Sequence, residues 1–259
     1  MKLHGRITVF GEYLLKENLS YCLCLKSSLF LSNETEDSNS IHSSYDEAKD
    51  ETIHLLRNLG IKIFSKIYGN LPLGYGLSSS TILSMLHLNS MERQEIIALV
   101  DKEINGFSPS ELDYTSILKQ ANGIFGFGNW QQLKYFHPSY SLLVLPKEMK
   151  RNLADIQTQV SKSQKRQIEL TKQLFTVLSS TGELDFDLLF EYCKLLLSCK
   201  IYSGCATDIA TNLIAKGISC KCVGGLYDKA LLIVHSDSSA KATCDKYISY
   251  NFNFATIVE

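Results

Sequence analysis

The order of apolar and polar positions predicts a mixed protein in which strands dominate early and helices dominate late. Alternating or continuous apolar runs predict strands over residues 6–15, 21–31, 61–69, 124–136, 141–146 and, around a glycine turn, 218–234. Apolar residues at helical spacing predict helices over residues 81–88, 91–106, 108–123, 147–182, 184–204 and 206–217. The polar stretch 33–51 is expected to be a surface loop that runs into a helix.

The change in pattern near residues 146–150 also predicts a domain boundary. Before it, strands and helices are mixed, and after it long helices prevail. We therefore expect an N-terminal domain over residues 1–147 and a C-terminal domain over residues 148–259.

Composition narrows the classes of partner. The chain has 259 residues, and 26 Lys and Arg against 27 Asp and Glu leave a net charge of −1. A chain without a global basic field is not expected to bind nucleic acid or an anionic membrane. Residues 1–15 carry Arg6 and Glu12 where a secretion signal would be apolar. We expect a soluble, cytoplasmic protein, either a monomer or a homodimer.

Eight cysteines are present, and two pairs of them alternate within strand-like runs. Cys22 and Cys24 form one pair, and Cys220 and Cys222 form the other. The C-x-C spacing differs from the usual C-x-x-C of zinc sites, and no histidine pattern accompanies it. Reduced thiols in a reducing compartment are the favoured interpretation, with a metal site as the alternative.

The segment "PLGYGLSSST" at residues 72–81 stands between a predicted strand and a predicted helix. Glycines let the backbone approach a ligand closely, and a helix N-terminus offers unpaired N–H groups to an anion. The serines add hydroxyls for phosphate oxygens or Mg²⁺. The segment lacks the lysine of a Walker A loop. By itself it is equally consistent with an ordinary helix cap, where serine is favoured.

The same segment resembles the phosphate loop of the GHMP kinases, P-x-x-x-G-L-x-S-S-[AST]. The matching positions are Pro72, Gly76, Leu77, Ser79, Ser80 and Thr81. The resemblance implies a phosphate-binding role for residues of the loop: Gly74, Gly76, Leu77, Ser78, Ser79, Ser80 and Thr81.

Three further motifs of that family follow the required order. "HGRITVFGEYLL" is similar to the opening G-[KR]-x-x-L-x-G-E-[HY], and "SELD" at 110–113 is similar to S-G-x-D, with Glu111 where glycine is usual. "KCVGG" at 221–225 is a degenerate form of the C-terminal glycine motif. Its Gly224 and Gly225 are expected to contact phosphate in a shortened loop, or else to form an ordinary β-turn.

The resemblance implies a fold and a set of roles. The fold is α+β, with an N-terminal half like ribosomal protein S5 domain 2 and a ferredoxin-like C-terminal half. Asp113 would accept or orient the proton of a substrate hydroxyl, and Arg6 would hold Asp113 ionised and steady the transferred phosphoryl group. The alternatives are an acid favoured by the helix dipole and a surface arginine.

Mg²⁺ needs oxygen ligands. The resemblance assigns this role to Ser80 and to an acid on the helix before Asp113. Asp101 is the candidate acid and Glu103 its alternative, while both are also consistent with a solvated helix face. Glu12 and Tyr13 are implied to border the substrate pocket. Tyr13 replaces the histidine that sugar-specific members carry, whereas Arg6 is closer to the sugar kinases, so the acceptor stays open.

These features together predict an ATP- and Mg²⁺-dependent kinase that transfers the γ-phosphate to a hydroxyl of a small sugar or mevalonate-like alcohol. One alternative is a catalytically weakened relative that binds a nucleotide or metabolite and regulates another process. A second alternative is a decarboxylase of the diphosphomevalonate type.

Overall fold

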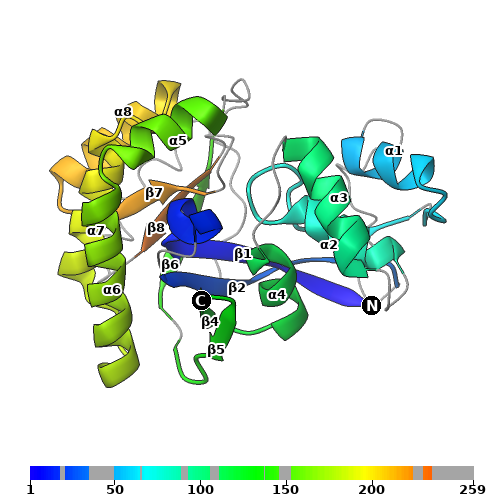
Figure 1. Cartoon of the computed structure of the whole chain (residues 1–259), viewed down its shortest axis with the longest axis horizontal. Coiled ribbons are helices and arrows are strands. Elements are labelled where there is room, and N and C mark those ends of the chain that lie inside the picture. Colours follow the sequence, from blue (N-terminus) through cyan, green and yellow to red (C-terminus); the bar gives the residue numbers. More distant parts are fainter. Residues whose placement is uncertain are drawn as a thin grey trace. The chain divides into compact units, whose positions relative to one another are not determined.

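The structure is a computed structural model of the whole chain (Figure 1). It describes residues 1–17, 21–34, 50–64, 66–88, 93–105, 111–136, 138–145, 153–223 and 230–234. The chain divides into two compact units. Unit 1 comprises Met1–Ile7 and Lys26–Ala121, and unit 2 comprises Thr8–Leu25 and Asn122–Glu259. The domain boundary expected at 147 falls outside the described residues and stays a prediction.

Two long strands contribute residues to both units. They are β1 (Lys2–Phe10) and β2 (Tyr21–Ser32), which are neighbours in one sheet. In unit 1, β2 pairs antiparallel with the short strand β3 (Tyr68–Gly69). In β1 the buried apolar residues Leu3, Ile7 and Val9 share one face, whereas β2 is buried along most of its length.

The described part of unit 1 also contains four helices, which appear in cyan to green in Figure 1. They are α1 (Glu51–Asn58), α2 (Ser79–His87), α3 (Arg93–Asn105) and α4 (Leu112–Lys119). Helix α2 packs against the other three, and its side chains from Ile82 to His87 are buried. This packing fixes the N-terminus of α2, which carries the glycine and serine loop.

The predicted strand over residues 61–69 is wrong except at its last two residues. Ile61 and Ile63 do not pair in a sheet. They pack instead against the buried cluster Ile53, Leu56 and Val100 of α1 and α3. The alternation of isoleucines therefore reflected burial on one side, without the hydrogen-bonded ladder of a strand.

Unit 2 holds two groups of strands. β4 (Gly123–Gly126) lies between β2 and β5 (Asn129–Gln132), and all of these pairs are antiparallel. A second, antiparallel sheet has the order β6 (Tyr140–Val144), β8 (Ala230–Val234), β7 (Cys220–Cys222).

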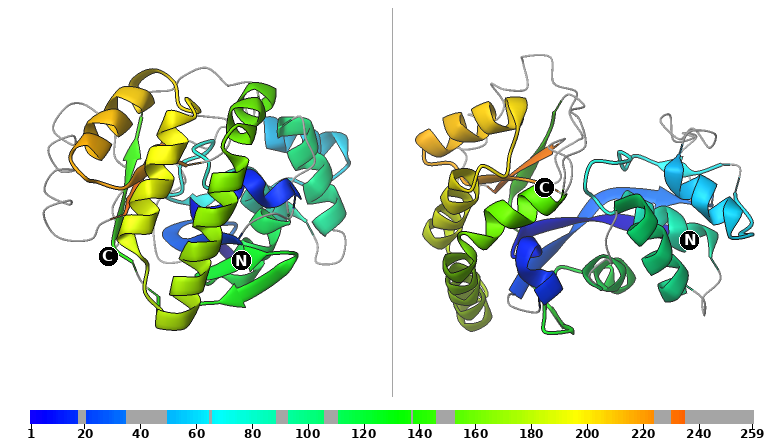
Figure 2. Two further views of the ribbon diagram at one scale, coloured as in Figure 1. Left: turned by 60° about the vertical axis from the view of Figure 1, so that its left-hand side comes forward. Right: turned by 45° about the horizontal axis from the view of Figure 1, so that its top comes forward.

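The described part of unit 2 also contains four α-helices (Figure 2). They are α5 (Leu153–Ser161), α6 (Gln164–Thr181), α7 (Phe186–Ser198) and α8 (Gly204–Ala215). Helices α7 and α8 pack on the sheet, and α6 packs on α7. Within the described residues, no helix has both the length and the apolar character needed to cross a membrane.

The first strand ends earlier than predicted, because the chain bends sharply at Gly11. Strand β1 stops at Phe10, and a 3-10 helix, η1, occupies Glu12–Glu17. Gly11 has φ +90°, and a Cβ there would lie 1.9 Å from the carbonyl oxygen of Tyr21. Only glycine fits this bend. The Gly11 N–H donates to the buried Tyr192 hydroxyl at 3.0 Å.

The seven described cysteines form no disulfide with one another. Cys22 and Cys24 share a face of β2 with their sulfurs 3.8 Å apart, and both are fully buried. No cluster of three or more His, Cys, Asp or Glu side chains able to hold a metal lies among the described residues. The reduced-thiol interpretation of the sequence stays a prediction.

Candidate active site

The loop before α2 turns three times into the left-handed region of the backbone. Gly74 and Gly76 both have φ 76°, and Ser78 has φ 62°. Alternation of this kind points successive N–H groups inward and is typical of anion-binding nests. Ser78 is the N-cap residue of α2, yet its side chain does not cap the helix. The N–H groups of the first turn are therefore available to a phosphate.

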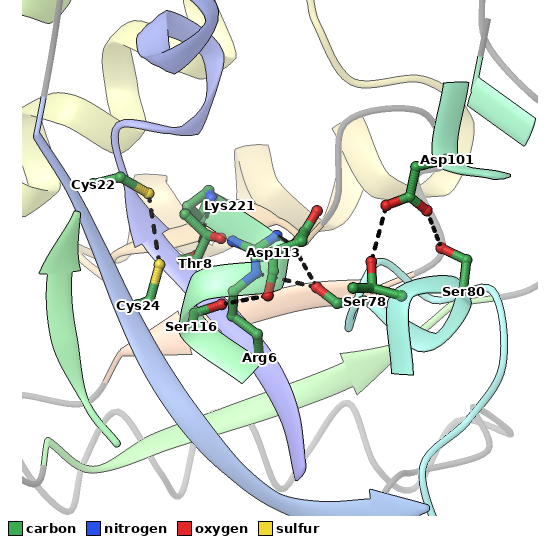
Figure 3. Close-up of polar contacts among 11 residues, drawn as sticks. Arg6, Thr8, Cys22, Cys24, Ser78, Ser80, Asp101, Asp113, Ser116 and Lys221 are labelled. Carbon is green, nitrogen blue, oxygen red and sulfur yellow. Dashed lines mark hydrogen bonds and ion pairs between the residues drawn. The ribbon is translucent and has the colours of Figure 1, made fainter. Parts of the chain in front are cut away.

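Arg6, Ser78 and Asp113 meet at this N-terminus, from three separate elements of unit 1 (Figure 3). The Ser78 hydroxyl donates to Asp113 Oδ1 at 2.5 Å and accepts from Arg6 Nε at 3.1 Å. The Arg6 guanidinium also forms an ion pair with the same carboxylate oxygen. Both side chains are largely buried, 12% and 29% exposed. A charge-assisted network with this little exposure holds its members in one geometry.

Neighbouring backbone contacts fix this network. The Arg6 N–H donates to the Leu77 carbonyl at 3.3 Å, which ties β1 directly to the loop. The His4 N–H donates to the Gln120 side chain at the end of α4. The second contact ties the C-terminal end of α4 to β1, while the ion pair between Arg6 and Asp113 ties its first turn to the same strand. The predicted catalytic pair is thus brought together within one unit.

A second polar group involves the first turn of α2. Ser80 and Thr81 donate to the two oxygens of Asp101 at 3.0 and 3.1 Å. Asp101 is only 3% exposed, although it lies on a helix whose neighbouring Glu103 is exposed. Burial, followed by the nearby negative charge of Asp113, raises the pKa of Asp101 to about 6. Of the two candidate acids, Asp101 and Glu103, it is therefore Asp101 that contacts the serine loop.

The donor atoms around Asp101 fit Mg²⁺. They are a carboxylate and a hydroxyl, the hard oxygen ligands that this ion prefers. Burial raises the pKa of Asp101 first and the negative charge of Asp113 second, and a bound cation would offset both effects. One protein acid and one hydroxyl suit an ion that takes its other ligands from phosphates and water.

The remaining loop residues have structural contacts. Ser79 accepts the Gly74 N–H at 2.9 Å and is 8% exposed, so its hydroxyl closes the loop on itself. Leu77 is fully buried and anchors the loop in the core of unit 1. The proposed phosphate contacts of Ser79 and Leu77 would therefore come from the backbone. Gly224 and Gly225 lie outside the described residues.

Glu12 and Tyr13, the predicted substrate residues, belong to unit 2 and are described there by themselves. The Glu12 carboxylate forms an ion pair with Lys221 of β7, which also donates to the Thr8 carbonyl at 3.1 Å. Lys221 is 1% exposed. Sequence reasoning noted Lys221 within a motif but missed its partner. The available signal was a lysine between two cysteines in an otherwise apolar strand.

Comparison with solved structures places the whole chain in one fold. Over 100% of this chain and 98% of the other, it superposes on a Methanococcus jannaschii mevalonate kinase with a TM-score of 0.63 at 14% identity. An L. major mevalonate kinase gives 0.65 at 16% identity, covering 96% of this chain and 91% of that one. A Streptococcus pneumoniae phosphomevalonate kinase gives 0.64 at 15% identity, covering 99% and 97%.

These three enzymes are GHMP kinases, and the chain has the GHMP kinase fold. The predicted α+β fold class is confirmed. No protein-family profile matches the chain, and no curated protein matches it by sequence. At identities of 14–16%, the superposition establishes the fold, and the chemistry has to be argued from the site.

Proposed function

We propose that the protein is an ATP-dependent kinase that phosphorylates a hydroxyl group of a small metabolite. The observation that carries this proposal is the Arg6–Ser78–Asp113 network at the N-terminus of α2. It combines a carboxylate base, a permanent cation and a phosphate-binding helix terminus within one unit.

The residues have distinct parts in this reaction. The loop N–H groups and the α2 dipole hold the phosphates of the nucleotide. Arg6 stabilises the charge of the transferred phosphoryl group, and Asp113 takes the proton of the attacking hydroxyl. Ser80 and Asp101 would hold Mg²⁺, which supplies charge neutralisation on the phosphates.

Structures of proteins with this fold support a nucleotide and a small alcohol as ligands. A Streptococcus pneumoniae phosphomevalonate kinase was solved with phosphomevalonate and AMPPNP, and it superposes with a TM-score of 0.59 at 15% identity. The L. major enzyme was solved with R-mevalonate, and a Lactococcus lactis galactokinase with galactose. We propose the same class of acceptor here, a sugar or a mevalonate-like alcohol, for a protein acting in the cytoplasm.

The test is ADP release by the full chain with ATP and Mg²⁺ over a panel of sugars, polyols and mevalonate-like acids. Turnover with at least one acceptor is expected. Asp113→Asn should lower kcat by about 10²–10⁴-fold, because it removes the base, and should change ATP affinity only a few-fold. Glu111→Gln is the matched control, because Glu111 is an exposed acid two residues away that caps nothing.

The other outcomes identify the rival functions. Tight ATP binding without turnover over the whole panel would replace the kinase by a nucleotide-binding regulatory protein. Carbon dioxide release together with ATP consumption would show a decarboxylase. Asp113→Asn with unchanged turnover would remove Asp113 from catalysis.

A further inference from the structure

Ser78 stands at the N-cap position of α2, but its conformation is not that of a capping serine. Serine at an N-cap ordinarily has extended backbone and accepts an N–H of the first turn. Here Ser78 has φ 62° and ψ 33°, and its side chain makes no cap hydrogen bond. A residue with a Cβ is disfavoured in this region, which suits glycine. The left-handed backbone turns the hydroxyl away from the helix and toward Asp113.

The surroundings of the Ser78 hydroxyl are those of an activated nucleophile. Its oxygen is 2.5 Å from Asp113 Oδ1, to which it donates, and 3.1 Å from Arg6 Nε. Arg6 in turn orients the carboxylate through an ion pair. A hydroxyl, a base within hydrogen-bond reach and a third group that orients the base together define such a site. Ser78 thus occupies the position that the proposed function assigns to the hydroxyl of the acceptor.

The other hydroxyls of the loop are arranged differently. Ser79 accepts a backbone N–H and is buried. Ser80 and Thr81 both donate to Asp101. Ser78 is therefore distinguished from its neighbours by a base and a cation at once.

We propose that Ser78 is a phosphorylation site that the protein modifies itself when no acceptor is bound. This inference rests on the proposed function for its phosphoryl donor, a nucleoside triphosphate. In the step, Ser78 Oγ forms a bond to the γ-phosphorus, and the bond from that phosphorus to the β,γ-bridging oxygen breaks. Asp113 takes the hydroxyl proton, and the nucleoside diphosphate leaves.

The modified serine would inhibit the enzyme. Phosphoserine carries nearly two negative charges, which Arg6 would pair but which Asp113 would repel. The phosphate would also occupy the space that an acceptor hydroxyl needs beside the base. An acceptor that displaces the Ser78 hydroxyl from Asp113 should protect the residue from modification.

The experiment incubates the full chain with ATP and Mg²⁺ without acceptor and follows the intact mass and the peptide map. We expect one added phosphoryl group on Ser78. Because the reaction is intramolecular, its first-order rate constant should not change with protein concentration. Ser78→Ala and Ser78→Gly should gain none, and the glycine variant suits the left-handed backbone, so it keeps the loop fold. Ser116→Ala should be modified like the parent, since that hydroxyl donates only to the Asp113 carbonyl.

The outcomes separate this inference from the kinase function. Turnover of an acceptor without modification of Ser78, or modification at Ser79, Ser80 or Thr81, overturns the inference and leaves the kinase. Absence of both turnover and modification overturns both. Modification at Ser78, lost in Asp113→Asn and suppressed by a turned-over acceptor, supports the inference.

Discussion

Replacing Lys221 by methionine tests whether a buried ion pair stabilises unit 2. Lys221 lies on β7 between Cys220 and Cys222, so strand alternation directs it to the opposite face from the two thiols. It reaches the Glu12 carboxylate and the Thr8 carbonyl, which belong to the first residues of the unit. Methionine keeps the length and apolar character of the stem and removes the charge together with the hydrogen-bond donor to Thr8.

The size of the expected loss in unfolding free energy follows from the burial of Lys221 and Glu12. The Lys221 side chain is 2% exposed and that of Glu12 is 12% exposed, so solvent does little to screen the pair. Removing one partner of a buried pair leaves an uncompensated charge and costs about 3–5 kcal/mol. Losing the donor to the Thr8 carbonyl is included in that range, since an unsatisfied buried acceptor costs about 1–3 kcal/mol by itself. Removing both charges should cost less than removing one.

The assay is equilibrium unfolding in urea, followed by the fluorescence of Trp130, the single tryptophan, which belongs to unit 2. Lys221→Met should lose about 3–5 kcal/mol of unfolding free energy, and Lys221→Met with Glu12→Gln only about 1–3 kcal/mol. The control is Lys194→Met, whose lysine pairs with Glu191 while half exposed and should cost less than about 1 kcal/mol.

Two results would refute this reasoning. A Lys221→Met variant within about 1 kcal/mol of the parent would show that the charge is hydrated. A double variant whose loss equals the sum of the single losses would show that Lys221 and Glu12 do not interact. In either case Glu12 would be available to contact a substrate directly. A coupled pair instead makes Glu12 a residue that positions the bend at Gly11.

Local patterns predicted the helices better than the strands. The helix expected over 91–106 is α3, because its apolar stripe coincides with its buried face. The strand expected over 61–69 is nearly absent, because the isoleucines there are buried against helices without a strand to pair with. Periodicity reports which side of a segment is buried, whereas a strand also needs a partner that periodicity does not reveal.

The candidate site was predictable only as a set of motifs. Arg6, Ser80, Asp101 and Asp113 were assigned from a family resemblance, and the structure brings them together within unit 1. The link from Arg6 to Ser78 spans 72 residues of sequence, which no local rule can anticipate. The left-handed conformation of Ser78 was equally hidden, because serine ordinarily predicts a cap with extended backbone.

Two further predictions concern buried titratable groups of unit 1. Because the pKa of Asp101 is raised to about 6, the folded protein loses stability as the pH rises from about 4 to 6 and this carboxylate becomes charged. Asp101→Asn removes that charge, so its free energy of unfolding at pH 7.5 should exceed that of the parent by at most about 3 kcal/mol. If Asp101 also binds Mg²⁺, the same variant should lose ATP-dependent turnover, and a variant that is less stable at that pH would contradict the assignment. His87 behaves in the opposite sense, because burial lowers its pKa to about 4 while its Nδ1 accepts the Phe64 N–H at 3.1 Å. The unfolded chain takes up that proton first, so stability should fall as the pH drops from 6.5 toward 4. His87→Gln keeps an acceptor for Phe64 but cannot titrate. Its free energy of unfolding, measured in urea at a series of pH values, should therefore fall less between pH 6.5 and 4 than that of the parent. An equal fall in both proteins would mean that His87 is hydrated.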